Sequence, residues 1–185
     1  FISDLKINKF NLLTNQYTII YNQEKEIIDK IVWDGDTYRT ISYGKLNSAY
    51  FGNVKPFKND PYQALAVDSF LNNKITMIKG PAGSGKTFLS LAFLLNALER
   101  NKIDKIIVFC NTVATKNSAK LGFYPGTRDE KLLDSQIGNL LSSKLGDKMM
   151  VEKLIDENKL VLLPLSDIRG YDTTGMRAGI YISEA

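Results

Sequence analysis

The chain has 185 residues, of which 44% are apolar and 24% charged, and its formal net charge is +4. These values are typical of a globular protein with a largely dry core. The sequence contains no histidine and a single cysteine, Cys110, which excludes histidine-ligated metal sites, serine–histidine catalysis and an internal disulfide. No run of 18 apolar residues predicts a membrane span. One cysteine fits a reducing compartment, so we expect a cytoplasmic protein.

The first 50 residues are polar and rich in β-forming side chains, and they predict a small N-terminal β segment. Within "KIVWDGDTYRTISY", Asp34-Gly35 stands between two β-like runs, which is a hairpin signal. Trp33, Tyr38 and Tyr43 have two interpretations. They could offer stacking surfaces for nucleic-acid bases, or they could pack within the segment, and the pattern favours packing.

From residue 51 onward, apolar runs alternate with helical patterns. One helix is predicted to begin after Asp60 as N-cap, with Pro61 at its first position and Gln63 three residues after the cap. The inward face of that helix is expected to hold Ala64, Val67, Phe70 and Leu71. Four short apolar runs predict buried strands: "KITMIKG", "KIIVFC", "KLVLLPL" and "GIYIS". Further helices are predicted in "TFLSLAFLLNALER", 129–145 and 147–157. This alternation predicts an α/β domain over 51–185, with a parallel sheet covered by helices.

Residues 80–87 read "GPAGSGKT" and match the phosphate-loop motif G-x-x-x-x-G-K-[ST] in full. Glycines let successive backbone N–H groups point at phosphate oxygens, and a following helix adds its positive N-terminal end. Lys86 would supply a cation for the β- and γ-phosphates, and Thr87 a hydroxyl for Mg²⁺. A glycine-rich turn with a stray lysine is the alternative. The predicted nucleotide contacts are Gln63, Gly80, Pro81, Ala82, Gly83, Ser84, Gly85, Lys86, Thr87 and Phe88.

The last residues, "GIYISEA", form an apolar strand pattern followed by Ser183 and Glu184. In P-loop ATPases, a second strand usually ends in an aspartate that holds the magnesium shell, and a following glutamate orients the attacking water. We therefore predict Lys86 and Glu184 as catalytic residues, with Thr87 and Ser183 as metal ligands. Because a serine hydroxyl is neutral, weaker metal affinity and slow hydrolysis are expected. A plain edge strand that ends in solvent is the alternative.

Residues 53–185 resemble the PhoH-like ATPases, which are related to superfamily 1 helicase cores. Five pieces carry the resemblance in the right order: "NDPYQALAVD", "GPAGSGKT", "KLGFYPG", "PLSDIRG" and "ISEA". The resemblance implies a RecA-like P-loop fold that binds ATP and Mg²⁺. The sequence departs from the family pattern at Ser183, where the family has aspartate, and at "CNT", where the family has an arginine. The family domain continues past its Asp-Glu-Ala segment, so we expect the domain to be incomplete at Ala185.

The resemblance also suggests roles for single residues. Gln63 would recognise adenine, whereas the local pattern has it close a capping box with Asp60, and both interpretations stay open. Arg169 and Arg177 could reach phosphates or neighbouring subunits, or they could simply be solvated. Four residues near a predicted strand end could contact nucleic acid: Asn111, Thr112, Lys116 and Lys120.

The function implied is Mg²⁺-dependent ATP hydrolysis coupled to RNA or single-stranded DNA, in a homo-oligomer and without a membrane. The net charge permits nucleic-acid binding but does not argue for it. The alternative is a ring-forming or assembly protein that uses ATP structurally, with little turnover. A small-molecule kinase would need a substrate-binding acid or arginine set near the loop, and none is identified. The resemblance leaves open that this chain is a bacteriophage-encoded member, for which the compartment would be the host cytoplasm.

Overall fold

The computed structural model describes residues 4–41, 43, 46–110, 136–145 and 148–183. It separates into two compact units, one of residues 1–45 and 55–86 and one of residues 46–54 and 87–185. The division falls inside the phosphate-loop motif, between Lys86 and Thr87. A boundary near residue 50 stays a prediction.

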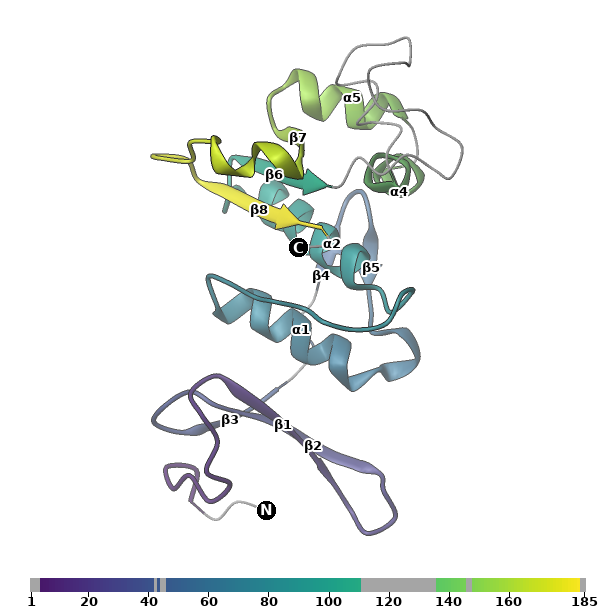
Figure 1. Ribbon diagram of the computed structural model, residues 1–185. Helices are drawn as coiled ribbons and strands as arrows, with labels where there is room; N and C mark the ends of the chain where they lie inside the picture. Colours follow the sequence, from purple (N-terminus) through teal and green to yellow (C-terminus); the bar gives the residue numbers. More distant parts are fainter. Residues whose placement is uncertain (1–3, 42, 44–45, 111–135, 146–147, 184–185) are drawn as a thin grey trace. The chain divides into compact units, whose positions relative to one another are not determined.

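The first unit holds four labelled elements (Figure 1): β1 (Gln16–Tyr21), β2 (Ile27–Trp33), β3 (Tyr38–Thr40) and α1 (Pro61–Asn72), with a short 3-10 turn, η1 (Phe57–Asn59), before α1. The second unit holds β4 (Leu46–Ser48), β5 (Gly52–Val54), β6 (Lys105–Cys110), α4 (Gln136–Leu145), α5 (Lys148–Asp156), β7 (Leu160–Pro164), the 3-10 helix η3 (Leu165–Arg169) and β8 (Ala178–Ile182). Helix α2 (Lys86–Glu99) begins at the division between the units.

The N-terminal strands form an antiparallel sheet in the order β1-β2-β3, and the predicted hairpin is confirmed. The Asp34 carboxylate accepts the backbone N–H groups of Asp36 and Thr37 at 3.0 and 2.8 Å, which lowers the pKa of Asp34. Trp33 and Tyr38 pack edge to face, with ring centroids 4.8 Å apart and only 2% of Tyr38 exposed. These two rings are therefore packing residues of the sheet and not exposed stacking surfaces.

Helix α1 begins where predicted, with Pro61 as its first residue and the Asp60 side chain accepting the Tyr62 N–H at 2.9 Å. Ala64 and Val67 are buried as expected, but the prediction for Leu71 is wrong, because Leu71 is 51% exposed. Asp68 is instead 4% exposed. A hydrophobicity pattern cannot anticipate a buried carboxylate, because its burial depends on partners from distant parts of the chain.

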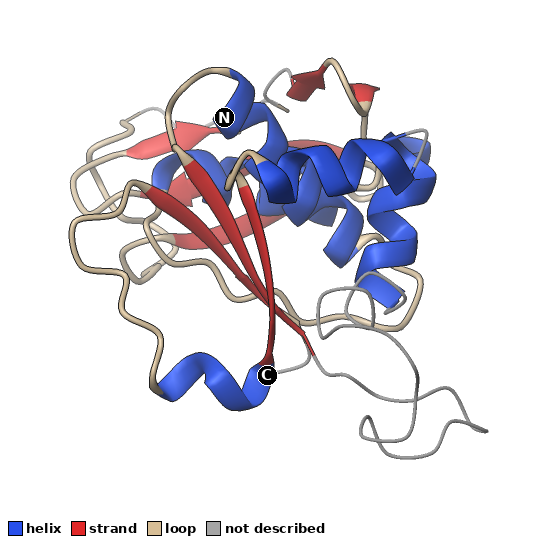
Figure 2. Cartoon of the chain, turned by 90° about the horizontal axis from the view of Figure 1, so that it is seen from above, coloured by secondary structure: helices blue, strands red, loops and turns tan. Residues whose placement is uncertain are grey.

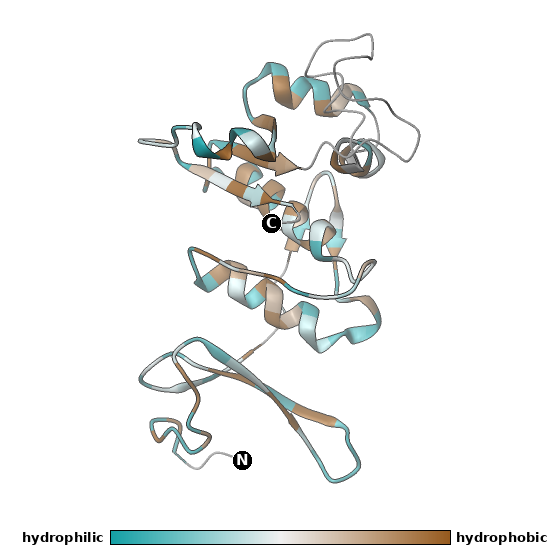
Figure 3. Cartoon of the chain, in the orientation of Figure 1, coloured by the Kyte–Doolittle hydropathy of each residue, from teal (hydrophilic) through white to brown (hydrophobic). Residues whose placement is uncertain are grey.

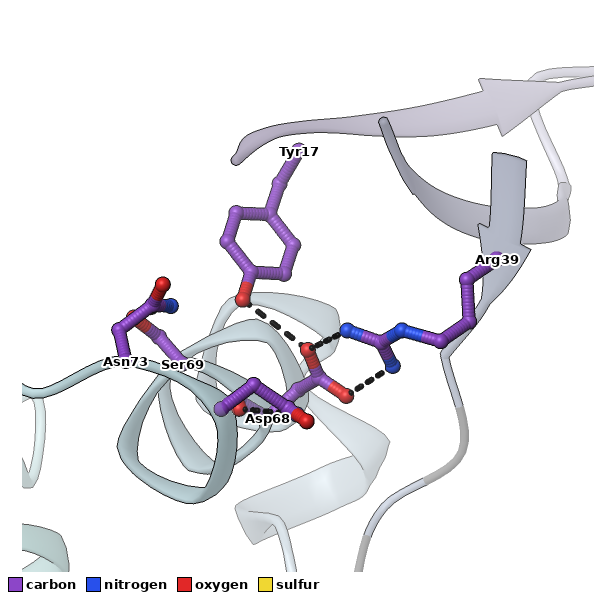
Figure 4. A network of polar contacts seen from close by, with 6 residues as sticks. Tyr17, Arg39, Asp68, Ser69 and Asn73 are labelled. Carbon is purple, nitrogen blue, oxygen red and sulfur yellow. Dashed lines mark hydrogen bonds and ion pairs between the residues drawn. The ribbon is translucent and has the colours of Figure 1, made fainter. Parts of the chain in front are cut away.

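Asp68 is held by two side chains of the N-terminal sheet (Figure 4). Arg39 donates from both terminal nitrogens to the two carboxylate oxygens at 2.7 and 2.9 Å, and the Tyr17 hydroxyl donates at 3.0 Å. The hydrogen bond to Asp68 raises the pKa of Arg39, while burial and the carboxylate raise the pKa of Tyr17, so both donors keep their protons at neutral pH. This arrangement satisfies the buried charge and joins the sheet to α1.

Loss of the Arg39 guanidinium is expected to destabilise the protein. Arg39→Met leaves the buried Asp68 with Tyr17 alone, so we expect a loss of about 1.5 kcal/mol, at the low end for hydrogen bonds to charged groups because the Arg39 side chain is 38% exposed. Urea unfolding followed by circular dichroism measures the change. The matched control is Lys153→Met, which breaks an exposed 4.0 Å pair with Glu157 and should change stability by less than about 0.5 kcal/mol. Equal losses in the two variants would contradict the assignment.

The second unit contains a parallel sheet in the order β7-β6-β8, and the predicted α/β class with helices beside a parallel sheet is confirmed. Val108 is paired with Leu162 of β7 and with Tyr181 of β8. Figure 2 shows these strands side by side, and Figure 3 shows apolar stretches along β6 and α2. The sheet brings the carboxyl ends of the three strands to one edge, where ligands sit in open α/β sheets.

Helix α2 is buried over most of its length, as its sequence predicts. Its leucines join β6, β7, α4 and α5 in one hydrophobic cluster that includes Leu91, Leu95, Val108, Leu141, Val151 and Leu160. The helix also anchors the β4–β5 hairpin. The Glu99 carboxylate accepts the Ser48 hydroxyl at 2.6 Å and the Ala49 N–H at 3.0 Å, and the Asn96 amide donates to the Asn47 carbonyl.

Gly179 permits the close approach of α2 to β8. A Cβ at this position would lie 2.4 Å from a Leu94 methyl and 2.9 Å from a methyl of Ile103. Gly179→Ala should therefore cost about 1 kcal/mol of unfolding free energy, at the low end for overpacking because both methyls end flexible side chains. The matched control is Gly170→Ala, where nothing lies within 4 Å. Urea unfolding compares the two variants, and an unchanged stability in Gly179→Ala would show that the packing relaxes freely.

One strand prediction is wrong. Residues 74–80 are not in a strand, and Ile75 and Met77 are 90% and 82% exposed. An apolar run indicates a preference for burial, but a strand also needs a neighbour that supplies backbone hydrogen bonds. No strand within the described residues pairs with this segment. The predicted helix over 129–145 appears as α4 from residue 136, and residues 129–135 lie outside the described part.

Candidate functional site

The glycine-rich loop of the first unit is shaped by its glycines. Gly83 and Gly85 have φ values of +76° and +85°, in the left-handed region that side-chain-bearing residues rarely adopt. The Lys86 ammonium donates to the carbonyls of Gly80 and Pro81, both at 2.8 Å. The side chain of Lys86 therefore folds back over the start of the loop and holds a positive charge there.

Gln63 connects this loop to the turn before α1. Its side-chain oxygen accepts the Phe57 N–H at 2.9 Å, and its side-chain nitrogen donates to the Ser84 carbonyl at 3.2 Å. The capping-box interpretation is therefore wrong, because the N–H of Asp60 donates instead to the Phe57 carbonyl at 2.9 Å. The sequence predicted the start of α1 correctly. The Gln63 side chain nevertheless leaves the helix cap and bonds the Phe57 N–H and the Ser84 carbonyl of the glycine-rich loop. Its role toward adenine stays a prediction.

In the second unit, the motif ends with Thr87, and Phe88 follows it. The Thr87 hydroxyl lies 3.0 Å from the Tyr181 hydroxyl of β8. The Phe88 ring packs against Phe51 with centroids 5.3 Å apart. The side chain of Phe88 is thus used in packing, so any nucleotide contact by this residue would come from its backbone.

Ser183 follows β8 directly, at the carboxyl edge of the sheet. Its backbone N–H donates to the Phe109 carbonyl at 2.9 Å, which extends the parallel pairing with β6 by one more hydrogen bond. Glu184 lies outside the described residues, as do Asn111, Thr112, Lys116 and Lys120. The roles predicted for all of them therefore stay predictions.

The two arginines lie at different ends of the second unit's sheet. Arg169 closes η3, which follows β7 and so begins at the carboxyl edge. Arg177 precedes β8 at the amino edge, where it pairs with Asp104 at 3.3 Å and donates to the Asn101 carbonyl. Arg177 therefore stabilises the start of β8 and does not face the edge that carries Ser183.

Asp68 and Tyr181 are among the polar residues whose tertiary partners the sequence did not predict. For Tyr181 a signal was present: alternation along a strand puts Tyr181 on the same face as Ser183. For Asp68 the signal was only a carboxylate among apolar positions of α1. The described residues contain no group of three or more acidic, cysteine or histidine side chains that could hold a metal ion. None of their helices is long and apolar enough to cross a membrane.

Comparison with known proteins gives matches over the loop-containing part of the chain. The profile of the family described as "PhoH-like protein" matches residues 55–184. A "PhoH-like protein" of Mycobacterium tuberculosis is 33% identical over 106 residues, which cover 56% of this chain and 29% of that protein. "Protein PhoH2" of Thermobispora bispora is 33% identical over 117 residues, or 58% of this chain and 26% of that protein.

A shorter match is found with the "DNA polymerase alpha-associated DNA helicase A" of Saccharomyces cerevisiae, 34% identical over 65 residues. These residues are 34% of this chain and 10% of the helicase. The matched region spans less than a third of the length of the three relatives named here.

Proposed function

Because the chain belongs to the PhoH-like family, we propose that it binds ATP with Mg²⁺ through residues 80–87. The proposed activity is ATP hydrolysis coupled to action on RNA or single-stranded DNA. The observation that carries the proposal is the complete phosphate-loop motif, with two of its glycines in the left-handed region. The similarity of this chain to the PhoH-like family and to a DNA helicase favours a motor or remodelling role over a role in small-molecule metabolism.

The residues present fit a magnesium–nucleotide complex. The Lys86 ammonium already bonds two loop carbonyls, so it is close to where the loop N–H groups would hold phosphate oxygens. The Thr87 hydroxyl would give one ligand to Mg²⁺, whose remaining ligands would be phosphate oxygens and water. When bound, Mg²⁺ neutralises charge on the β- and γ-phosphates.

Gln63 would recognise adenine. Its amide has one donor and one acceptor side, which match the pattern of the adenine edge. Both sides are used by Phe57 and Ser84 in this structure, so base binding would exchange these hydrogen bonds for others. Such an exchange would link base recognition to the loop through the Ser84 carbonyl.

Glu184 would position the attacking water and accept its proton, and Lys86 would stabilise charge on the transferred phosphoryl group. Ser183 would contribute a neutral hydroxyl where a carboxylate is usual. A hydroxyl attracts the cation less strongly than a carboxylate would. Because serine stands at this position in place of aspartate, we expect a low rate of hydrolysis. A low rate would also fit a second candidate function, an oligomeric assembly protein that binds ATP and turns it over little.

The experiment compares ATPase rates of the natural full-length protein with and without single-stranded RNA and DNA, at low and moderate salt. Stimulation that weakens as salt rises is expected, because contacts to phosphates release counterions. The variant Lys116→Ala/Lys120→Ala should lose most of the stimulation. The control Lys148→Ala changes a lysine of α5, outside the motif and outside the segment after β6.

Absence of stimulation by any nucleic acid at low salt, together with stable ATP-dependent oligomers in light scattering, would support the assembly function instead. Failure of ATP to bind in calorimetry would overturn both candidates.

A further inference from the structure

The hydroxyl pair of Thr87 and Tyr181 adds a residue to the site that the motif does not contain. The two oxygens lie 3.0 Å apart, and either could be the donor. Thr87 is the second residue of α2 and Tyr181 is in β8, so the contact lies within one compact unit. It links the metal ligand proposed from the motif to the strand that Ser183 follows.

The donors and acceptors of a hydroxyl determine which partners this pair needs when a cation binds. A threonine hydroxyl has one hydrogen and two lone pairs. If a lone pair faces a cation, the hydrogen must point away and needs an acceptor there. A carboxylate on the neighbouring strand would be a strong acceptor, but position 183 holds a neutral serine. The Tyr181 oxygen, already within hydrogen-bonding distance of Thr87, can take that hydrogen.

The Tyr181 ring is held firmly enough for this role. Tyr181 is opposite Val108 in the parallel pairing of β8 with β6, and its ring packs against the hydrophobic cluster of the unit. The backbone hydrogen bond from Ser183 to Phe109 fixes the strand two residues further on. Packing and pairing together hold the phenol oxygen beside the Thr87 hydroxyl.

We propose that Tyr181 is a positioning residue for the divalent cation: its oxygen accepts the Thr87 hydrogen and so aims a Thr87 lone pair at the metal. Without a cation, either hydroxyl can donate; with one, Thr87 donates to Tyr181 and keeps a lone pair for the metal. Tyr181 thus takes over part of the role of the missing carboxylate at 183. This inference rests on the proposed binding of magnesium and ATP.

The test is Tyr181→Phe, which removes one oxygen and keeps the ring. Calorimetry measures ATP affinity with excess Mg²⁺ and again in EDTA, and the ratio of the two affinities is the magnesium enhancement. We expect this enhancement to fall about fivefold in the variant, the size of one hydrogen bond, while the affinity in EDTA changes less than about twofold. Tyr50→Phe, whose ring packs against the same cluster, is the matched control and should match the wild type.

Two further variants separate positioning from a loss of structure. In a Thr87→Val background, Tyr181→Phe should have no further effect on the enhancement, because the group it orients is gone. Adding Ser183→Asp to Tyr181→Phe should restore the enhancement, because a carboxylate then supplies the acceptor. A purely structural defect would not be rescued in this way.

An unchanged magnesium enhancement in Tyr181→Phe overturns the inference, and so does an equal loss of affinity with and without Mg²⁺. Should Tyr181→Phe not fold, Ser183→Asp alone decides: an enhancement no greater than in the wild type would place this edge away from the cation and overturn the inference. If the wild type binds no ATP in either condition, the proposed function fails, which is a different result.

Discussion

Glu184→Gln is expected to lower ATP hydrolysis roughly 10²–10⁴-fold, the usual contribution of a general base, while ATP affinity stays near that of the wild type. Glutamine keeps the size and hydrogen-bonding capacity of the side chain but cannot accept the proton of the attacking water. The measurement is a phosphate-release assay at saturating ATP, paired with calorimetric titration of ATP into the same preparation. The variant should therefore hold ATP without turning it over.

The control for this prediction is Glu24→Gln, which removes an exposed carboxylate between β1 and β2 and should leave both readouts unchanged. Equal hydrolysis in Glu184→Gln and the wild type would remove Glu184 from the catalytic step. With a low wild-type rate, that result would favour ATP as a structural component of an assembly.

Lys86→Ala is expected to weaken ATP binding roughly 10- to 100-fold, because hydrogen bonds to charged groups contribute about 1.5–3 kcal/mol each. The variant removes the ammonium that bonds the carbonyls of Gly80 and Pro81 and that would meet the phosphates. Calorimetric titration with ATP, ADP and AMP measures how the loss of affinity depends on the number of phosphates. The loss should be largest for ATP and smallest for AMP, because Lys86 is predicted to contact the β- and γ-phosphates.

The matched control for Lys86→Ala is Lys79→Ala, which removes a lysine just before the motif. It should leave the affinities for all three nucleotides nearly unchanged. If both variants lose the same affinity, the effect is one of general positive charge and the loop has no specific role. If Lys86→Ala leaves the affinity for ATP unchanged, the motif is a glycine-rich turn that does not bind nucleotide.

The sequence alone determined the features that depend on neighbouring residues or on a repeating pattern. Asp34-Gly35 predicted the hairpin because a carboxylate that accepts following N–H groups, next to a residue free to adopt positive φ, builds a turn from within. Asp60 and Pro61 fixed the start of α1 for the same reason. The apolar runs of β6, β7 and β8 predicted a parallel sheet, since each is separated from the next by a long crossover.

Tertiary structure decided what depends on residues far apart in the chain. Gln63 bonds the Phe57 N–H and the Ser84 carbonyl, not the cap of its own helix. Asp68 is buried because Arg39 and Tyr17 reach it from the N-terminal sheet, and Leu71 is exposed instead. An apolar run at 74–80 did not become a strand, because composition carries no information on which neighbour completes its hydrogen bonds.

The candidate site divides along the same line. Residues 80–87 could be predicted because phosphate binding by a loop needs glycines, a lysine and a hydroxyl at fixed short spacing. The partner of Thr87 could not, because Tyr181 lies 94 positions away and shares only a strand face with Ser183. A motif specifies the groups that touch a ligand, whereas the groups that orient them are brought into contact only when α2 packs against β8 and Gly179 lets the two approach.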